Sequence, residues 1–136
     1  MVLKKRLRRV QKSARKTWYD IADEVVTDVR ASLPTALGER LKGLTVTLDP
    51  YPTPDEELQE GDDEALLGLF VGPCFGEEME SVEPMPPVIR LFVENLRDEA
   101  EDDPGRFRQE VRITLLHEIG HYLGLDEDDL EERGLA

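Results

Sequence analysis

The stretch VRITLLHEIGHYLG, residues 111–124, carries the strongest structural signal in this 136-residue chain. In a helix each residue is rotated by about 100° from the one before it. If this stretch is helical, its apolar side chains therefore lie on one broad face, as they do in a helix packed against a core. Asp103 and Pro104 favour the N-cap and first position of a helix, and Gly124 is typical of a helix end. The sequence therefore predicts a helix from roughly Pro104 to Leu123.

The two histidines of the chain, His117 and His121, both lie in this stretch and flank Glu118. They are about 40° apart on a helix, so both imidazoles project from one side and can hold a single Zn²⁺ across one turn. Glu118 lies about 100° from His117, too far round to be a comfortable ligand but well placed to hydrogen-bond a water on the ion. Two histidines and one carboxylate leave zinc a position for water, whose pKa falls to about 7. We therefore expect Glu118 to act as the general base that activates this water for attack on a carbonyl.

The simpler interpretation of the His-Glu-x-x-His spacing is an acidic helix that carries two surface histidines and no metal. The motif arises by chance in roughly a few per thousand chains of this length. Here it also lies on a predicted helix with an apolar face behind it, which is the context that a metal site requires. We therefore favour the metal site.

The third zinc ligand is expected in the acidic run after Gly124, where the chain can turn back toward the metal. Glu127, ten residues after His117, has the favoured spacing, and Asp126 and Asp128 remain alternatives. The run is also typical of a solvated helix start, where carboxylates interact favourably with the helix dipole. Both interpretations can hold, because only one of these carboxylates has to bind the ion.

The charge of the chain is unevenly distributed around a net value of −14. Residues 1–16 contain eight basic side chains and no acidic one, whereas residues 17–136 contain nine basic and 31 acidic side chains, a net charge of −22. The negative charge of residues 17–136 repels nucleic acid and anionic membrane surfaces. Nucleic-acid binding is therefore not expected of these residues, and residues 1–16 are its only candidate.

The chain contains one cysteine, Cys74, so an intrachain disulfide is excluded and a cytoplasmic location is expected. No window approaches the uninterrupted apolar length of a membrane span, and the N-terminus has no apolar segment of the secretory type. We expect residues 1–16 to form a basic extension and residues 17–136 to form one domain. An apolar stripe at helical spacing predicts a first helix from about Ala14 to Leu33, with the basic residues as an extension of that helix.

The middle of the chain predicts a small sheet. Three apolar segments have strand character, Leu44–Asp49, Leu66–Gly72 and Val88–Asn95, and the interior Gly68 indicates a bulge or a close approach of backbone. An acidic solvated loop, with one helical turn as the alternative, is predicted for Asp55–Glu64, and a long proline-rich connection is predicted for the residues that follow the second strand. The predicted fold is therefore a single α+β domain, a mostly three-stranded sheet packed against an N-terminal helix and a C-terminal helix that carries the histidines.

Residues 117–127 fit the extended pattern His-Glu-x-x-His-x-x-Gly-x-x-(Asp/His), and the chain resembles the minimal zincin-like metallopeptidases of bacteria. The resemblance runs from about Trp18 to the end and includes LLGLFVG (residues 66–72) and IRLF (residues 89–92). It implies that His117 and His121 are metal ligands and Glu118 the catalytic base. The chain departs from the pattern in two ways: it has Glu127 where the family usually has Asp, and no methionine follows the motif where the related metzincins have one.

The resemblance implies a zinc-dependent metallopeptidase that hydrolyses peptide bonds in a peptide or protein substrate. Zincins bind an extended peptide along a sheet edge above the metal, and residues 66–71 are the candidate edge by this analogy. Tyr122 and Thr114 are interpreted as helix-packing residues rather than catalytic ones, and Cys74 as a bystander. The alternative function is a catalytically inactive metal-binding or protein-interaction module, and the sequence leaves a homodimer open.

Overall fold

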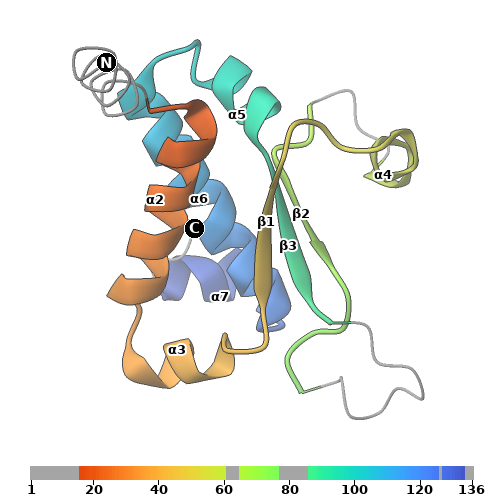
Figure 1. Ribbon diagram of the computed structural model, residues 1–136. Helices are drawn as coiled ribbons and strands as arrows, with labels where there is room; N and C mark the ends of the chain where they lie inside the picture. Colours follow the sequence, from red (N-terminus) through yellow and green to blue (C-terminus); the bar gives the residue numbers. More distant parts are fainter. Residues whose placement is uncertain (1–15, 61–64, 77–85, 126, 134–136) are drawn as a thin grey trace, which may run out of the picture.

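The computed structural model describes residues 16–60, 65–76, 86–125 and 127–133. Three strands form one sheet, with the two longest helices on one side of it and a short acidic helix on the other (Figure 1). The elements in chain order are α2 (Trp18–Ser32), α3 (Thr35–Arg40), β1 (Thr45–Asp49), α4 (Pro54–Glu60), β2 (Gly68–Val71), β3 (Val88–Phe92), α5 (Val93–Glu99), α6 (Pro104–Tyr122) and α7 (Glu127–Glu132). The predicted α+β fold, a small sheet packed against an N-terminal and a C-terminal helix, is confirmed.

The strands of the sheet lie in the order β1-β3-β2, and the sheet is mixed. β1 runs parallel to β3, with Val46 opposite Ile89, and β2 runs antiparallel to β3, with Phe70 opposite Ile89. The main-chain N–H of Phe92 donates to the carbonyl of Leu67 at 3.0 Å, which continues the β2–β3 pairing by one residue. β2 is therefore an edge strand, as the resemblance predicted.

The hydrophobic core lies between the sheet and helices α2 and α6. Alternation along β3 turns Ile89 and Leu91 toward these helices, where both are fully buried, and leaves Arg90 on the opposite face. Each helix contributes one apolar stripe to the same core: Ile21, Ala22, Val25 and Val29 from α2, and Phe107, Val111, Leu115, Ile119 and Tyr122 from α6.

Helix α2 begins later than the apolar stripe predicted. Thr17 has an extended backbone (φ −78°, ψ 166°), its hydroxyl accepts a hydrogen bond from the N–H of Asp20 at 3.1 Å, and its own N–H donates to the Asp20 carboxylate at 2.9 Å. This reciprocal capping box sets the first residue of the helix at Trp18. The prediction that this helix starts at Ala14 and continues the basic segment without a break is therefore wrong, because Thr17 interrupts it. Residues 1–15 themselves lie outside the described residues.

The segment predicted as an acidic loop contains helix α4. Thr53 and Glu56 form a second capping box, with N–H···O distances of 2.7 and 3.2 Å, and Pro54 occupies the first helical position. The Glu56 carboxylate also pairs with Arg90 on the outer face of β3, which anchors α4 to the sheet. The local pattern Thr53-x-x-Glu56 was the signal for this helix, and residues 61–64 of the predicted loop lie outside the described residues.

Strand β3 ends three residues earlier than predicted, because Val93 begins helix α5. Val93 and Leu96, three residues apart, are both fully buried, so the apolar pattern that resembled a strand end is the inner face of a helix. Asn95, on the same helix, donates from its side-chain amide to the carbonyl of Leu66 at 2.9 Å. This contact fixes the chain where it enters β2.

Candidate metal centre

Helix α6 is the element that positions the predicted metal ligands. It begins as predicted: the carboxylate of Asp103 accepts a hydrogen bond from the N–H of Arg106 at 2.8 Å, and Pro104 stands in its first turn. It ends just before Gly124, whose φ of 76° lies in the left-handed region that glycine adopts freely. The apolar face of α6 is held against the core, so the remaining face is fixed in direction, and this face carries the histidines.

His117, Glu118 and His121 converge on one point. The rings of His117 and His121 meet edge to face, with centroids 4.5 Å apart and an angle of 67° between their planes. Nδ1 of His121 lies 3.2 Å from Oε2 of Glu118. One ligand atom from each of the three side chains lies within 4.8 Å of the other two. The expectation that both imidazoles share one face of the helix is confirmed.

The three side chains differ in their exposure to solvent. The Glu118 side chain is only 11% exposed, whereas that of His121 is 43% exposed. They line a cleft of about 270 Å³ between α6 and edge strand β2, together with Leu66, Gly68, Leu69 and Phe70. The carboxylate therefore lies at the inner wall of the cleft, with an imidazole at the solvent side.

The donor set of this cluster fits a zinc ion. Imidazole nitrogen and carboxylate oxygen are both common zinc donors, and a closed structural site would instead offer four such side chains, usually with cysteine. The described residues supply two imidazole donors, His117 and His121, with the Glu118 carboxylate within 4.8 Å of them, beside an open cleft. An arrangement with few protein ligands and open access suits a metal that must also accept a water or a substrate.

The predicted third ligand is not placed. Glu127 is the first residue of α7, but its side chain and the whole of Asp126 lie outside the described residues. Asp128 is described and exposed, and it does not belong to the cluster of His117, Glu118 and His121. Glu127 and Asp126 therefore stay predictions as ligands, and Asp128 gains no support.

The segment after β2 is hydrogen-bonded to the end of helix α6, which sequence reasoning did not predict. The N–H of Phe75 donates to the carbonyl of Tyr122 at 2.7 Å, and the thiol of Cys74 donates to the carbonyl of His121 at 3.5 Å. Tyr122 itself is 2% exposed and packs against Phe70 and Phe75, so its interpretation as a core residue is confirmed. No local sequence signal connects residues so far apart along the chain.

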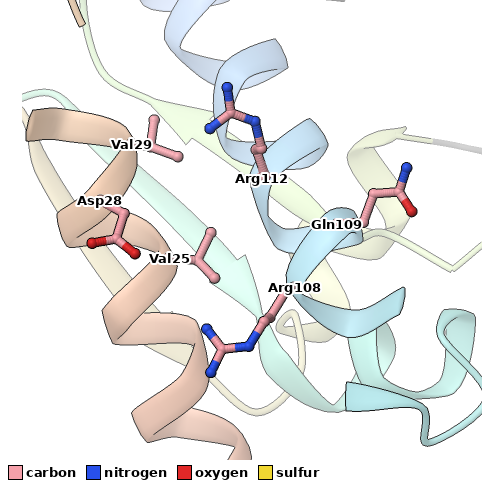
Figure 2. Close-up of a pocket in the computed structure, with 6 residues that line it drawn as sticks. All are labelled: Val25, Asp28, Val29, Arg108, Gln109 and Arg112. Atoms are coloured by element: carbon pink, nitrogen blue, oxygen red, sulfur yellow. The ribbon is translucent and has the colours of Figure 1, made fainter. Parts of the chain in front are cut away.

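A second hollow, of about 310 Å³, lies between α2 and α6. Figure 2 shows Arg108, Gln109 and Arg112 extending from α6, with Val25, Asp28 and Val29 on α2 across from them. One of its cations is engaged, since Arg108 pairs with Glu24 at 2.9 Å. None of these lining residues is a histidine or a cysteine, and Asp28 is the only carboxylate among them. Among the residues that the structure describes, the cleft beside β2 is therefore the place where side chains that could hold a metal come together.

Two comparisons with known proteins bear on this site. A family model described as zincin-like metallopeptidase matches residues 41–135, which is most of the chain and includes β2, β3 and the whole of α6. A search of curated proteins finds no match. Among the described residues, we find no helix whose length and apolar character would let it span a membrane.

Proposed function

Because the chain belongs to the zincin-like metallopeptidase family, we propose that it is a zinc-dependent peptidase that hydrolyses peptide bonds in peptides or proteins. His117 and His121 hold the ion, Glu127 completes the protein ligands, and Glu118 is the catalytic base. The observation that carries the proposal is the convergence of His117, Glu118 and His121 at the wall of one open cleft.

The side chains of the cleft divide the chemistry between them. Zinc, when bound, polarises a carbonyl and lowers the pKa of a water. The Glu118 carboxylate then accepts the proton of the attacking water and returns it to the leaving amine, which is general acid–base catalysis by one group. Its contact with Nδ1 of His121 keeps this carboxylate oriented along the cleft wall. The two neutral imidazoles keep the metal against one face of a rigid helix.

Strand β2 offers the main-chain groups that an extended peptide would need. In an antiparallel pair, residues alternate between facing the partner strand and facing away from it. The hydrogen bond from Phe92 to Leu67 places Leu67 in the facing set, so the main-chain groups of Gly68 and Phe70 point away from β3. Both residues line the cleft. We therefore place the substrate as an added strand along β2, with its scissile bond beside Glu118.

The test of this function is cleavage of a peptide library by the zinc-loaded protein. Glu118→Gln removes the base but keeps a neutral side chain of the same size, so cleavage should fall to background while zinc content stays at the wild-type level. Glu110→Gln makes the same chemical change two turns earlier on α6, outside the cleft, and should cleave as the wild type does. Zinc retained by both forms without cleavage by either would favour the inactive binding module instead.

The remaining expectations about partners stay predictions. A cytoplasmic location, a homodimer and a separate role for the basic residues 1–16 are tested by nothing in the described part of the chain. Mobility-shift measurements with and without residues 1–16 would test nucleic-acid binding, which must vanish with these residues and weaken with added salt.

A further inference from the structure

Edge strand β2 packs tightly against helix α6 at Gly68. A Cβ atom added to Gly68 would lie 2.6 Å from Cγ2 of Thr114, and 3.4 Å from both the carbonyl oxygen of Arg90 and Cδ2 of Leu91. Carbon atoms pack at about 3.5–4.0 Å, so no side chain fits at this position unless the strand, the helix or the Thr114 side chain moves. The close approach of backbone predicted at Gly68 is therefore confirmed, and its partner is a methyl group.

This requirement for glycine is purely spatial. Gly72, Gly76 and Gly124 have positive φ angles, whereas Gly68 does not, so its backbone conformation is open to any residue. Alanine at position 68 would therefore bring one change, the contact of its methyl group with Thr114. The Gly68→Ala substitution therefore tests the effect of the spacing between β2 and α6 by adding a single carbon atom.

Thr114 connects this contact to the metal centre. It is buried on α6 and precedes His117 by three residues and Glu118 by four, so the three side chains are neighbours on one face of the helix. Gly68 lines the cleft whose other wall carries His117, Glu118 and His121. The strand thus packs on the helix one turn before the catalytic residues.

We propose that Gly68 and Thr114 act as a positioning pair that sets the height of strand β2 above the metal-binding turns of α6. The proposal rests on the proposed function, because what the pair positions is a peptide bound along β2. If the strand is pushed outward, the scissile carbonyl moves away from Glu118 although no catalytic side chain has changed. Misplacement of reacting groups by about 1 Å can cost on the order of 100-fold in rate.

The test is steady-state cleavage by the zinc-loaded full chain. Gly68→Ala should lower kcat by about tenfold or more, with KM within about threefold of the wild type, since the main-chain groups of β2 remain available. Zinc content should not change, because His117 and His121 are untouched. Gly38→Ala is the matched control, since a Cβ at Gly38 meets nothing within 4 Å, and its kcat should equal that of the wild type.

The double variant Gly68→Ala/Thr114→Ser identifies the cause. Serine keeps the hydroxyl and removes the methyl that Gly68 faces, so the double variant should recover most of the lost kcat. A general loss of packing would instead grow worse when the Thr114 methyl is also removed. If Gly68→Ala does not fold, Thr114→Ile enlarges the helix side of this contact, next to the methyl that faces Gly68, and should also lower kcat.

The outcomes separate this inference from the function on which it rests. No cleavage by the wild-type protein overturns the proposed function and the inference with it. Cleavage by Gly68→Ala at the wild-type kcat overturns the positioning pair alone. So does a loss of kcat that the double variant does not recover, or a loss that follows zinc content.

Discussion

His117 and His121 lie one helical turn apart, and their rings are in contact at a centroid distance of 4.5 Å. Two imidazoles in that position can share one ion without any movement of the backbone, since both are carried by the same helix. The helix is held by nine buried residues between Phe107 and Tyr122. The geometry of the ligands is therefore set by the core of the protein and not by a loop.

His117→Ala and His121→Ala should each weaken zinc binding by more than the roughly 10–100-fold that loss of a supporting contact costs, because each removes a direct ligand. The affinity is measured by competition with a chromophoric chelator. Arg112→Ala, which removes a larger side chain from the α2 side of the same helix, should bind zinc as the wild type does. Wild-type affinity in both histidine variants would contradict the site.

For single residues, the sequence predicted the structure correctly wherever the prediction depended only on neighbouring residues in the chain. The face shared by His117 and His121 follows from the number of residues per helical turn, and the helix end at Gly124 follows from glycine's access to positive φ. The partner of Gly68 was out of reach, because Thr114 is brought to it only by the packing of β2 on α6. Glu127 rests on spacing and resemblance alone, since its side chain is not described.

At the scale of elements, α4 shows how a charged segment is held on the sheet. Burial of the Glu56 carboxylate works to raise its pKa, but hydrogen bonds from the Thr53 main chain and the Arg90 guanidinium outweigh it and hold the pKa below its ordinary value. Arg90 also contacts Asp49 on β1 at 3.3 Å. Arg90 on the central strand β3 thus forms ion pairs with both α4 and β1.

This pairing predicts a dependence of stability on pH. A carboxyl group whose pKa is lower in the folded state contributes stability above its unfolded pKa, about 4.3 for Glu, and loses it as the pH falls through the folded value. Glu56→Gln should therefore be less stable than the wild type at neutral pH, and the difference should shrink in acid. Urea unfolding at several pH values measures this, with the exposed Glu57→Gln as control. A difference that stays constant into acid would show that the Glu56 charge is not the cause.

The mispredicted starts of α2 and α4 share one physical cause. Periodicity of apolar residues indicates which face of an element is buried, but it does not say where the element begins. The start of α2 is decided by the Thr17–Asp20 capping box, and that of α4 by the Thr53–Glu56 box. Both boxes are local side-chain to main-chain contacts, so they could have been found in the sequence.

At the scale of the whole molecule, the site depends on strands and helices that are distant in sequence. The order β1-β3-β2 leaves β2 at an edge beside α6, and the Cys74–Phe75 segment is bonded to the end of that helix. The resemblance suggested β2 as the edge, but apolar patterning alone assigns no strand order. The cleft exists because β2 and the residues that lead into it lie beside α6, which is why its presence could not be derived from the motif.

Because the proposed ligands His117 and His121 lie together in the folded protein and are not held together in the unfolded chain, we expect zinc to stabilise the fold. A ligand at about 100 times its Kd adds about 2.7 kcal/mol, which should raise Tm by several degrees in a thermal scan with zinc compared with one after chelation. The double variant His117→Ala/His121→Ala should show no such shift. An equal shift in that variant would mean that the ion binds elsewhere, for example on the acidic surface.

The central claim is that one zinc ion is held by His117 and His121 in the cleft beside β2. The most direct measurement is anomalous X-ray diffraction at the zinc absorption edge from crystals of the zinc-loaded protein. We predict a single strong peak within about 2.0–2.1 Å of one ring nitrogen of each histidine. A zinc peak at another place on the molecule, or imidazole rings that turn away from each other around no peak, would contradict it.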